Sequence, residues 1–148
     1  MARLVYLGTP PAAVAPLEAL VAAGHEVALV VSRSDARRGR GSAVSPSPVS
    51  AAAERLGLRR TDQLQQATEV SADLGVVVAY GRIVPAAVLE ALDMINLHFS
   101  LLPRWRGAAP VERAILAGDT VTGLCIMRLE AGLDTGPVLA RRELPMDG

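Results

Sequence analysis

Two short apolar runs, separated by a segment with helical spacing, occupy the first 31 residues and constrain the fold more than any other feature. The first run, Leu4–Leu7, ends at Gly8, and the second run is Glu26–Val31. Between them, Thr9 and two prolines favour a helix start, and leucines and valines then recur at helical spacing until Gly24. A strand, a helix and a strand over so short a stretch predict a βαβ unit, and its crossover implies a parallel sheet.

The rest of the chain continues this alternation. We expect helices over Val49–Leu56, Gln63–Ser71 and Pro85–Leu92, and a fourth from Pro110 to near Gly118. We expect strands over Leu74–Ala79, Met94–His98, Gly123–Leu129 and Val138–Leu144. The first of these strands is apolar throughout, as a central parallel strand is, and the last two are close enough in sequence to pair antiparallel. With Arg33–Pro48 expected to be a long loop, the pattern predicts a doubly wound α/β domain.

The totals limit the class of protein. A chain of 148 residues is about one domain, and a hydrophobic content of 51% is enough for a core. The formal net charge is zero, and the single cysteine, Cys125, excludes an internal disulfide. The N-terminal apolar run is too short for a signal peptide or a membrane span. We therefore expect a cytoplasmic protein.

Polar side chains come at or after the expected strands, where ligands bind in such sheets. Asn96 and His98 are two residues apart on one strand, so they point to the same face; Tyr80 follows another strand and Asp134 a third. This trio of amide, imidazole and carboxylate suits acyl transfer without a covalent intermediate. Asn96 can donate to the growing negative charge, His98 can stabilise it or move a proton, and Asp134 can orient the imidazole or accept the proton.

The residue types alone leave other interpretations open. An Asn or His at a strand end is usually satisfied locally, and Asp134 is also a natural turn residue. A metal site is disfavoured because the two histidines lie far apart in sequence and there is no cysteine cluster. The turn at Gly8 lacks the G-x-G-x-x-G pattern, which disfavours a nicotinamide dehydrogenase. Cys125 lies inside an apolar strand, so we do not expect it to be a nucleophile.

One long motif narrows the choice. The segment Asn96–Pro110 reads Asn-Leu-His-Phe-Ser-Leu-Leu-Pro-Arg-Trp-Arg-Gly-Ala-Ala-Pro and resembles the signature of the 10-formyltetrahydrofolate-dependent formyltransferases. Leu133–Gly136 resembles the downstream Asp element of that family. Together with shorter matches at Leu7–Pro10, Pro46–Val49 and Val78–Gly81, the long motif is most similar to the branch that formylates methionyl-tRNA. The resemblance covers essentially the whole chain and implies the Rossmann-like formyltransferase fold, with a mixed, mostly parallel sheet.

The resemblance also implies roles by position. The formyl donor would be 10-formyltetrahydrofolate, with no metal, the acceptor would be initiator methionyl-tRNA, and the catalytic residues would be Asn96, His98 and Asp134. Folate contacts would come from Val78, Tyr80, Ser100, Leu101, Leu102, Pro103 and Leu129. Contacts to tRNA would come from Arg33, Arg37, Arg38 and Arg40 in the basic loop, and from Arg104 and Arg106 beside Trp105. A solvated surface loop and a packed tryptophan are the alternatives for these two basic groups.

The tRNA enzymes that the motif resembles are longer than this chain and carry a C-terminal barrel-like domain. We therefore expect residues 1–148 to be a catalytic domain that is incomplete at its C-terminal end, from a monomeric parent, without the tRNA-binding barrel. A final helix over the sheet would also be missing, which would leave apolar surface exposed. Transfer to a small amine, or folate binding without turnover, stays open as an alternative function.

Overall fold

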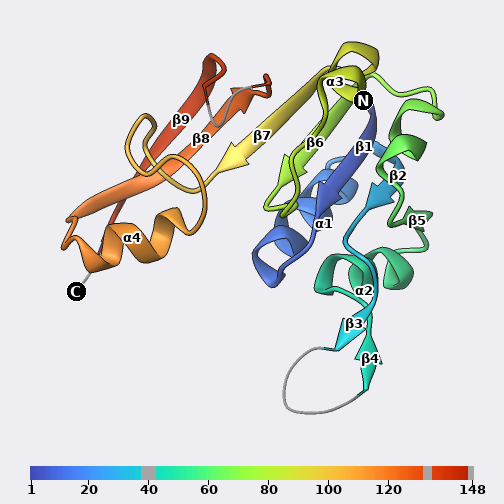
Figure 1. The fold of residues 1–148 in the computed structure, drawn as a ribbon, viewed down its shortest axis with the longest axis horizontal. Coiled ribbons are helices and arrows are strands. Elements are labelled where there is room, and N and C mark those ends of the chain that lie inside the picture. Colours follow the sequence, from blue (N-terminus) through green and yellow to red (C-terminus); the bar gives the residue numbers. More distant parts are fainter. Residues whose placement is uncertain (38–42, 132–134, 147–148) are drawn as a thin grey trace.

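One seven-stranded sheet organises the computed structural model, which describes residues 1–37, 43–131 and 135–146 (Figure 1). The strand order is β5-β2-β1-β6-β7-β8-β9. Neighbours from β5 to β7 are parallel, whereas β8 pairs antiparallel with both β7 and β9. The strand bounds are β1 (Arg3–Gly8), β2 (Glu26–Val31), β5 (Arg60–Thr61), β6 (Leu74–Val78), β7 (Met94–His98), β8 (Val121–Arg128) and β9 (Val138–Pro145). This confirms the predicted doubly wound, mostly parallel sheet and its antiparallel pair.

Helices bury the central strands on both faces. On one face, α1 (Val14–Ala22) and α2 (Pro48–Arg55) pack with Leu4 and Tyr6 of β1. On the other face, the 3-10 helix η2 (Leu64–Thr68) and α3 (Ala86–Ala91) pack with Val5 and Leu7. Because successive side chains of a strand point to opposite faces, a strand covered on both sides needs apolar residues at every position. This is why β1 reads as a continuous apolar run.

The turn after β1 differs from the prediction that Thr9 caps the first helix. The 3-10 helix η1 (Pro11–Ala13) comes before α1, and Thr9 donates its hydroxyl to the carbonyl oxygen of Tyr80 at 2.8 Å. The bond joins the ends of β1 and β6. Gly8 is needed beside it, since a Cβ there would lie 2.8 Å from the carbonyl oxygen of Val78. The hydroxyl of Thr9 therefore links the ends of β1 and β6 and does not cap the first helix.

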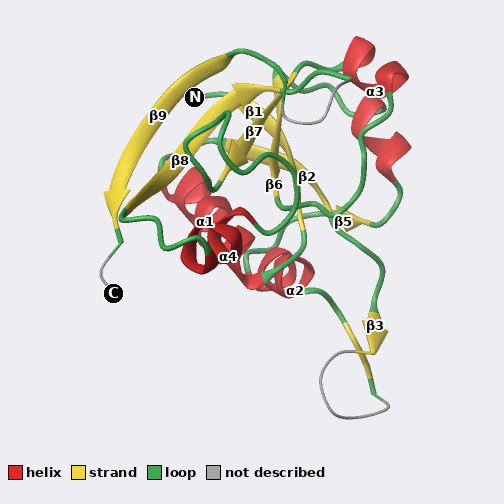
Figure 2. Cartoon of the chain, turned by 60° about the vertical axis from the view of Figure 1, so that its left-hand side comes forward, coloured by secondary structure: helices red, strands yellow, loops and turns green. Residues whose placement is uncertain are grey.

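Three further elements differ from the sequence prediction. The helix expected over Gln63–Ser71 is only the five-residue η2, because Ala67 is its single buried residue and there is little packing to extend it. The two-residue strand β5 was not expected, since it is too short to show a pattern. The expected long loop contains a small antiparallel pair, β3 (Ala36–Arg37) with β4 (Val44–Ser45). Figure 2 shows this pair projecting from the body of the molecule.

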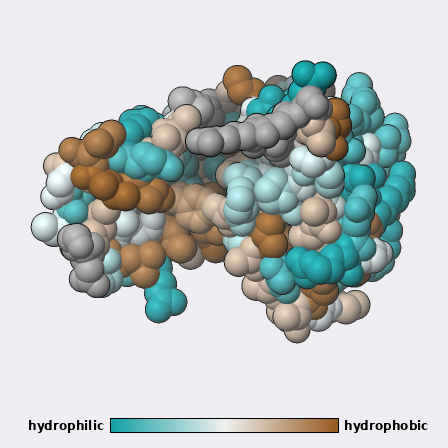
Figure 3. Space-filling model, turned by 90° about the horizontal axis from the view of Figure 1, so that it is seen from below, coloured by the Kyte–Doolittle hydropathy of each residue, from teal (hydrophilic) through white to brown (hydrophobic). Residues whose placement is uncertain are grey.

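The part of the sheet formed by β8 and β9 has much less cover. The helix α4 (Pro110–Leu116) precedes β8, and every residue of β9 is exposed. Large apolar side chains here are open to solvent, including Leu116 at 86%, Ile115 at 60% and Leu139 at 60%. Figure 3 shows apolar surface over this part of the molecule, on the left. No helix in the described part of the chain is long and apolar enough to cross a membrane.

Candidate active site

A cavity of about 540 Å³ lies against β7 and the end of β6. Its walls come from four separate parts of the chain, because the connections that leave β6, β7 and β8 all pass it. These parts are Val77 with residues 79–84, residues 96–99, residues 107–110 and residues 129–131. The position agrees with the rule that ligands of such sheets bind where the connections from neighbouring strands diverge.

Asn96 and His98 both line this cavity. Their two-residue spacing on β7 places them on the same face, as predicted. Asn96 is half-buried and His98 is 6% exposed. The Nε2 atom of His98 lies 2.8 Å from the carbonyl oxygen of Trp105. A carbonyl only accepts, so Nε2 is the donor in this contact and carries a proton.

Several predicted site residues do not line the cavity. Ser100 is fully buried and donates its hydroxyl to the carbonyl oxygen of Arg104 at 2.7 Å. Leu102 packs in a buried cluster with Cys125 and Met127. Of the residues expected to contact folate, Tyr80 and Leu129 are in the cavity wall, whereas the Ser100–Pro103 segment supports the loop beside it. Val78 and residues 101 and 103 are likewise absent from the wall.

Three other predicted residues lie outside the described part of the chain. They are Asp134, Arg38 and Arg40. Among residues 1–37, 43–131 and 135–146, no three His, Cys, Asp or Glu side chains form a group that could hold a metal ion.

The loop after β7 is fixed by Asp119, a residue that the sequence analysis missed. Arg104 donates to both oxygens of the Asp119 carboxylate, from Nε at 2.9 Å and from Nη2 at 2.6 Å. The indole nitrogen of Trp105 donates to Oδ2 of the same carboxylate at 2.7 Å. The bonds from Arg104 and Trp105 lower the pKa of Asp119 to about 2. Nothing in the sequence connects Asp119 with Arg104, since the two are 15 residues apart.

Two guanidinium groups lie close to the ring of the tryptophan. Arg104 lies over the Trp105 ring at 4.3 Å from its centre, and Arg113 of α4 at 5.2 Å. Such contacts are attractive because the face of an aromatic ring is electron-rich. A packed tryptophan beside two surface arginines is the alternative to tRNA contact for Arg104 and Arg106, and the tRNA contact stays a prediction. The side chains of Arg104 and Arg106 are both exposed, although Arg104 is bonded to Asp119.

Three residues other than glycine with a left-handed backbone conformation lie at or beside the cavity. Ala79 and Ala109 have φ of 49° and 54° and line the cavity, and Trp105, with φ of 60°, supplies the carbonyl that His98 contacts. Residues other than glycine rarely adopt this left-handed conformation, and they are found most often at functional sites. The strain therefore points to the same region as the polar residues.

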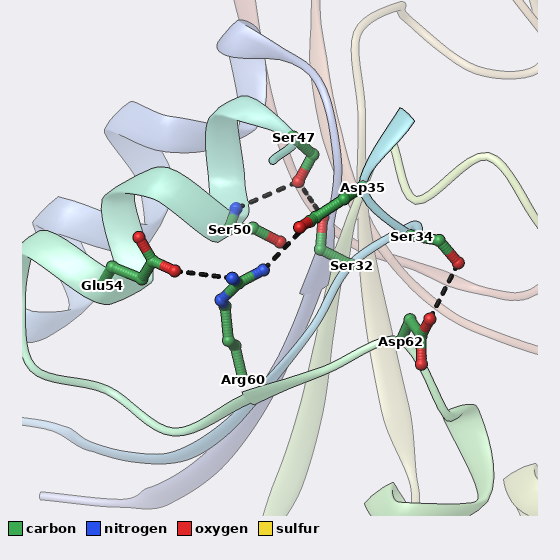
Figure 4. A network of polar contacts seen from close by, with 8 residues as sticks. All are labelled: Ser32, Ser34, Asp35, Ser47, Ser50, Glu54, Arg60 and Asp62. Atoms are coloured by element: carbon green, nitrogen blue, oxygen red, sulfur yellow. Dashed lines mark hydrogen bonds and ion pairs between the residues drawn. The ribbon is translucent and has the colours of Figure 1, made fainter. Parts of the chain in front are cut away.

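A separate polar network holds the base of the β3–β4 pair (Figure 4). The hydroxyls of Ser32 and Ser47 are 2.5 Å apart and buried, and Ser47 also accepts from the backbone N–H of Ser50 to cap α2. Arg60 donates to Asp35 at 3.3 Å and to Glu54 at 2.5 Å. The network fixes where the projecting pair leaves the body, and it leaves the Arg33 and Arg37 side chains exposed.

The comparison with family models decides the family. The formyl transferase model matches residues 2–147. The chain belongs to the formyl transferase family. This confirms the resemblance carried by the motif at Asn96–Pro110. That motif forms the end of β7, the loop fixed by Asp119 and the start of α4.

Curated relatives of this formyl transferase chain are named methionyl-tRNA formyltransferases. The relative from Jannaschia sp. is 54% identical, and the match covers 95% of this chain and 50% of the relative. The relative from Clavibacter michiganensis is 57% identical, covering 97% of this chain and 50% of the relative. The chain thus spans about half the length of the curated relatives it matches.

Solved structures share the fold of the formyl transferase chain. Phosphoribosylglycinamide formyltransferase from Bacillus halodurans superposes with a TM-score of 0.79 at 25% identity, covering 98% of this chain and 80% of that one. HypX from Aquifex aeolicus, solved in complex with tetrahydrofolic acid, gives a TM-score of 0.70 at 18% identity, covering 99% of this chain and 22% of that one. Both comparisons confirm the predicted Rossmann-like formyltransferase fold.

Proposed function

We propose that this chain carries the site that transfers a formyl group from 10-formyltetrahydrofolate to the amino group of methionyl-tRNA. One observation carries the proposal. Asn96 and His98 lie together on the wall of one cavity, in a chain more than half identical to proteins named methionyl-tRNA formyltransferase. The same proposal includes a cytoplasmic location and, in the complete protein, a monomer with a C-terminal barrel-like domain for tRNA.

The reaction needs a group that stabilises negative charge. The amine nitrogen attacks the formyl carbon and forms a C–N bond, and the formyl oxygen gains the charge. Asn96 donates its amide N–H to that oxygen, and the His98 ring stabilises it or moves the proton. When the intermediate collapses, the bond to N10 of the folate breaks, the amine loses a proton and N10 gains one. We assign Asp134 to the transfer of this proton on sequence grounds.

The cavity wall suits a flat heteroaromatic donor. Apolar residues form much of it, including Val77, Ile83, Val84, Leu97 and Leu129. Sites for such ligands are mostly apolar, with a few polar groups that fix the orientation. Tyr80 and Leu129 are the residues of the predicted folate set that face this space. We place the pterin ring here, with the formyl group toward Asn96.

The exposed arginines supply the contact to tRNA phosphates. Arg33 and Arg37 lie at the start of the projecting β3–β4 pair, and we include Arg38 and Arg40 from the sequence. Arg106 is exposed next to the cavity loop, whereas the guanidinium of Arg104 is held by Asp119. Replacing any arginine that binds a phosphate should make tRNA binding less dependent on salt.

A competition between acceptors tests the function. The complete gene product is assayed with 10-formyltetrahydrofolate and either charged initiator tRNA, glycinamide ribonucleotide or an amino sugar. We expect formyl transfer to the tRNA only, and a preference for a small amine would refute the proposed acceptor. Folate binding without transfer to any acceptor would instead favour the alternative of a binding module.

A further inference from the structure

Trp105 combines a strained backbone with a direct contact to His98. Its φ of 60° is in the left-handed region, and its carbonyl oxygen accepts from Nε2 of His98 at 2.8 Å. A residue other than glycine keeps such a conformation only where its surroundings fix it at several points. The hydrogen bond of the imidazole through Nε2 therefore depends on whatever fixes Trp105.

Asp119 fixes the side chain of Trp105. It is 13% exposed, and both carboxylate oxygens are occupied, Oδ1 by Arg104 and Oδ2 by Arg104 and Trp105. Two neighbouring residues of the loop are thus tied to one carboxylate on the turn between α4 and β8. A charged, bidentate contact of this kind is stronger and more directional than a neutral hydrogen bond.

A residue of α4 also fixes the loop that contains Trp105. Arg113 donates to the carbonyl oxygens of Arg106 at 2.8 Å and of Ala108 at 3.2 Å, and it lies over the Trp105 ring. It therefore holds the part of the loop that follows the tryptophan. Arg104, Arg113 and Asp119 are the charged groups that meet at Trp105. Of these, Asp119 alone anchors both the indole nitrogen and Arg104.

We propose that Asp119 is a positioning residue that, through Trp105, fixes the ring orientation and the tautomer of His98. The role rests on the proposed function, because His98 is a catalytic residue only if formyl transfer occurs here. With Nε2 bonded to the Trp105 carbonyl, which can only accept, the proton stays on Nε2. When Asp119 is replaced, Trp105 is released from its left-handed conformation and the imidazole can exchange between tautomers and rotamers.

Nitrogen NMR of the complete gene product, labelled at its histidine ring nitrogens, tests this directly. The His98→Gln variant assigns the His98 signals by their loss. We expect His98 of the wild type to show one tautomer with the proton on Nε2, and Asp119→Ala to show a mixture. The same variant should lower kcat about 10- to 100-fold with little change in KM for the folate, as for other residues that orient a functional group.

Further variants keep the test decisive. Asp119→Asn retains an oxygen for the indole nitrogen, so it should restore most of the single tautomer. If Asp119→Ala does not fold, Trp105→Phe removes the indole donor to Asp119 instead and should give the same mixture of tautomers. The control Glu26→Gln removes another carboxylate paired with an arginine, Arg3, at 2.7 Å from a distant part of the sheet, and should change neither readout.

The outcomes separate the two proposals. An unchanged His98 tautomer and unchanged kcat in Asp119→Ala would overturn the positioning role. So would a fall in kcat without a tautomer change, because that would indicate a purely structural effect. A wild type that shows the single tautomer but transfers no formyl group would refute the proposed function, while the NMR comparison still decides what Asp119 does.

Discussion

At the scale of single residues, Asn96 and His98 have the clearest expected effects. Asn96→Ala should lower kcat by roughly 10²- to 10³-fold, because one donor to a developing oxyanion contributes about that much. His98→Ala should lower it by roughly 10²- to 10⁴-fold, because the ring no longer moves a proton. Steady-state kinetics with circular dichroism checks both the rate and the fold. Near-normal turnover in either folded variant would refute the assigned role.

The pKa of Asp119 gives a prediction with a defined direction. It is lowered to about 2 in the folded chain, compared with about 3.9 in an unfolded one. The carboxylate therefore stabilises the loop fully above about pH 4, and this contribution disappears as the pH falls toward 2. Trp105 is the sole tryptophan of the 148 residues, so the fluorescence of this 148-residue chain should change over this range before circular dichroism reports unfolding. In Asp119→Asn the acid transition should be absent, and a transition identical to that of the wild type would contradict this assignment.

The sequence could predict some of these residues and not others. Asn96 and His98 were accessible because a strand places alternate residues on one face, and the motif identified that strand. The role of Asp119 could not be predicted, because only the turn after α4 brings this residue close to its partners Arg104 and Trp105. The backbone conformation of Trp105 was equally hidden, since no residue type signals a left-handed tryptophan.

At the scale of elements, the start of α2 depends on Ser47. Its buried hydroxyl accepts from Ser50 and contacts Ser32, so Ser47→Ala should remove a helix cap and leave the Ser32 hydroxyl without this partner. We expect the free energy of unfolding to fall by about 1–3 kcal/mol. Urea unfolding measures this. Ser34→Ala is the matched control: its bond to Asp62 is exposed, so the change should stay within about 0.5 kcal/mol.

Elements were predictable where packing and local pattern agree. The five-residue runs of β6 and β7 are covered by other elements and were found to within a residue. The η2 and β5 segments were missed because each has little burial of its own and depends on neighbouring elements. The pairing of β3 with β4 could not be predicted, because most residues of these two strands are exposed and so show no pattern of burial.

At the scale of the whole molecule, the uneven burial predicts association. The apolar side chains exposed on α4 and β9 should make the 148-residue chain form dimers or larger species as its concentration rises. Sedimentation velocity would show this. Replacing Leu116 and Leu139 together with glutamine should shift the distribution toward the monomer. A wild-type chain that stays monomeric at high concentration would show that this apolar surface does not mediate association.

The place of β9 at the end of the strand order has a consequence for the backbone itself. Within the described residues, β9 pairs only with β8, so its outer N–H and C=O groups form an edge that another strand could extend. Proteins commonly guard such edges with charge. Arg141, Arg142 and Glu143 occupy the middle of β9, and because neighbouring residues alternate, the strand carries charge on both faces. An approaching strand would have to desolvate these charges, so pairing along this edge is disfavoured even while the apolar face nearby remains open.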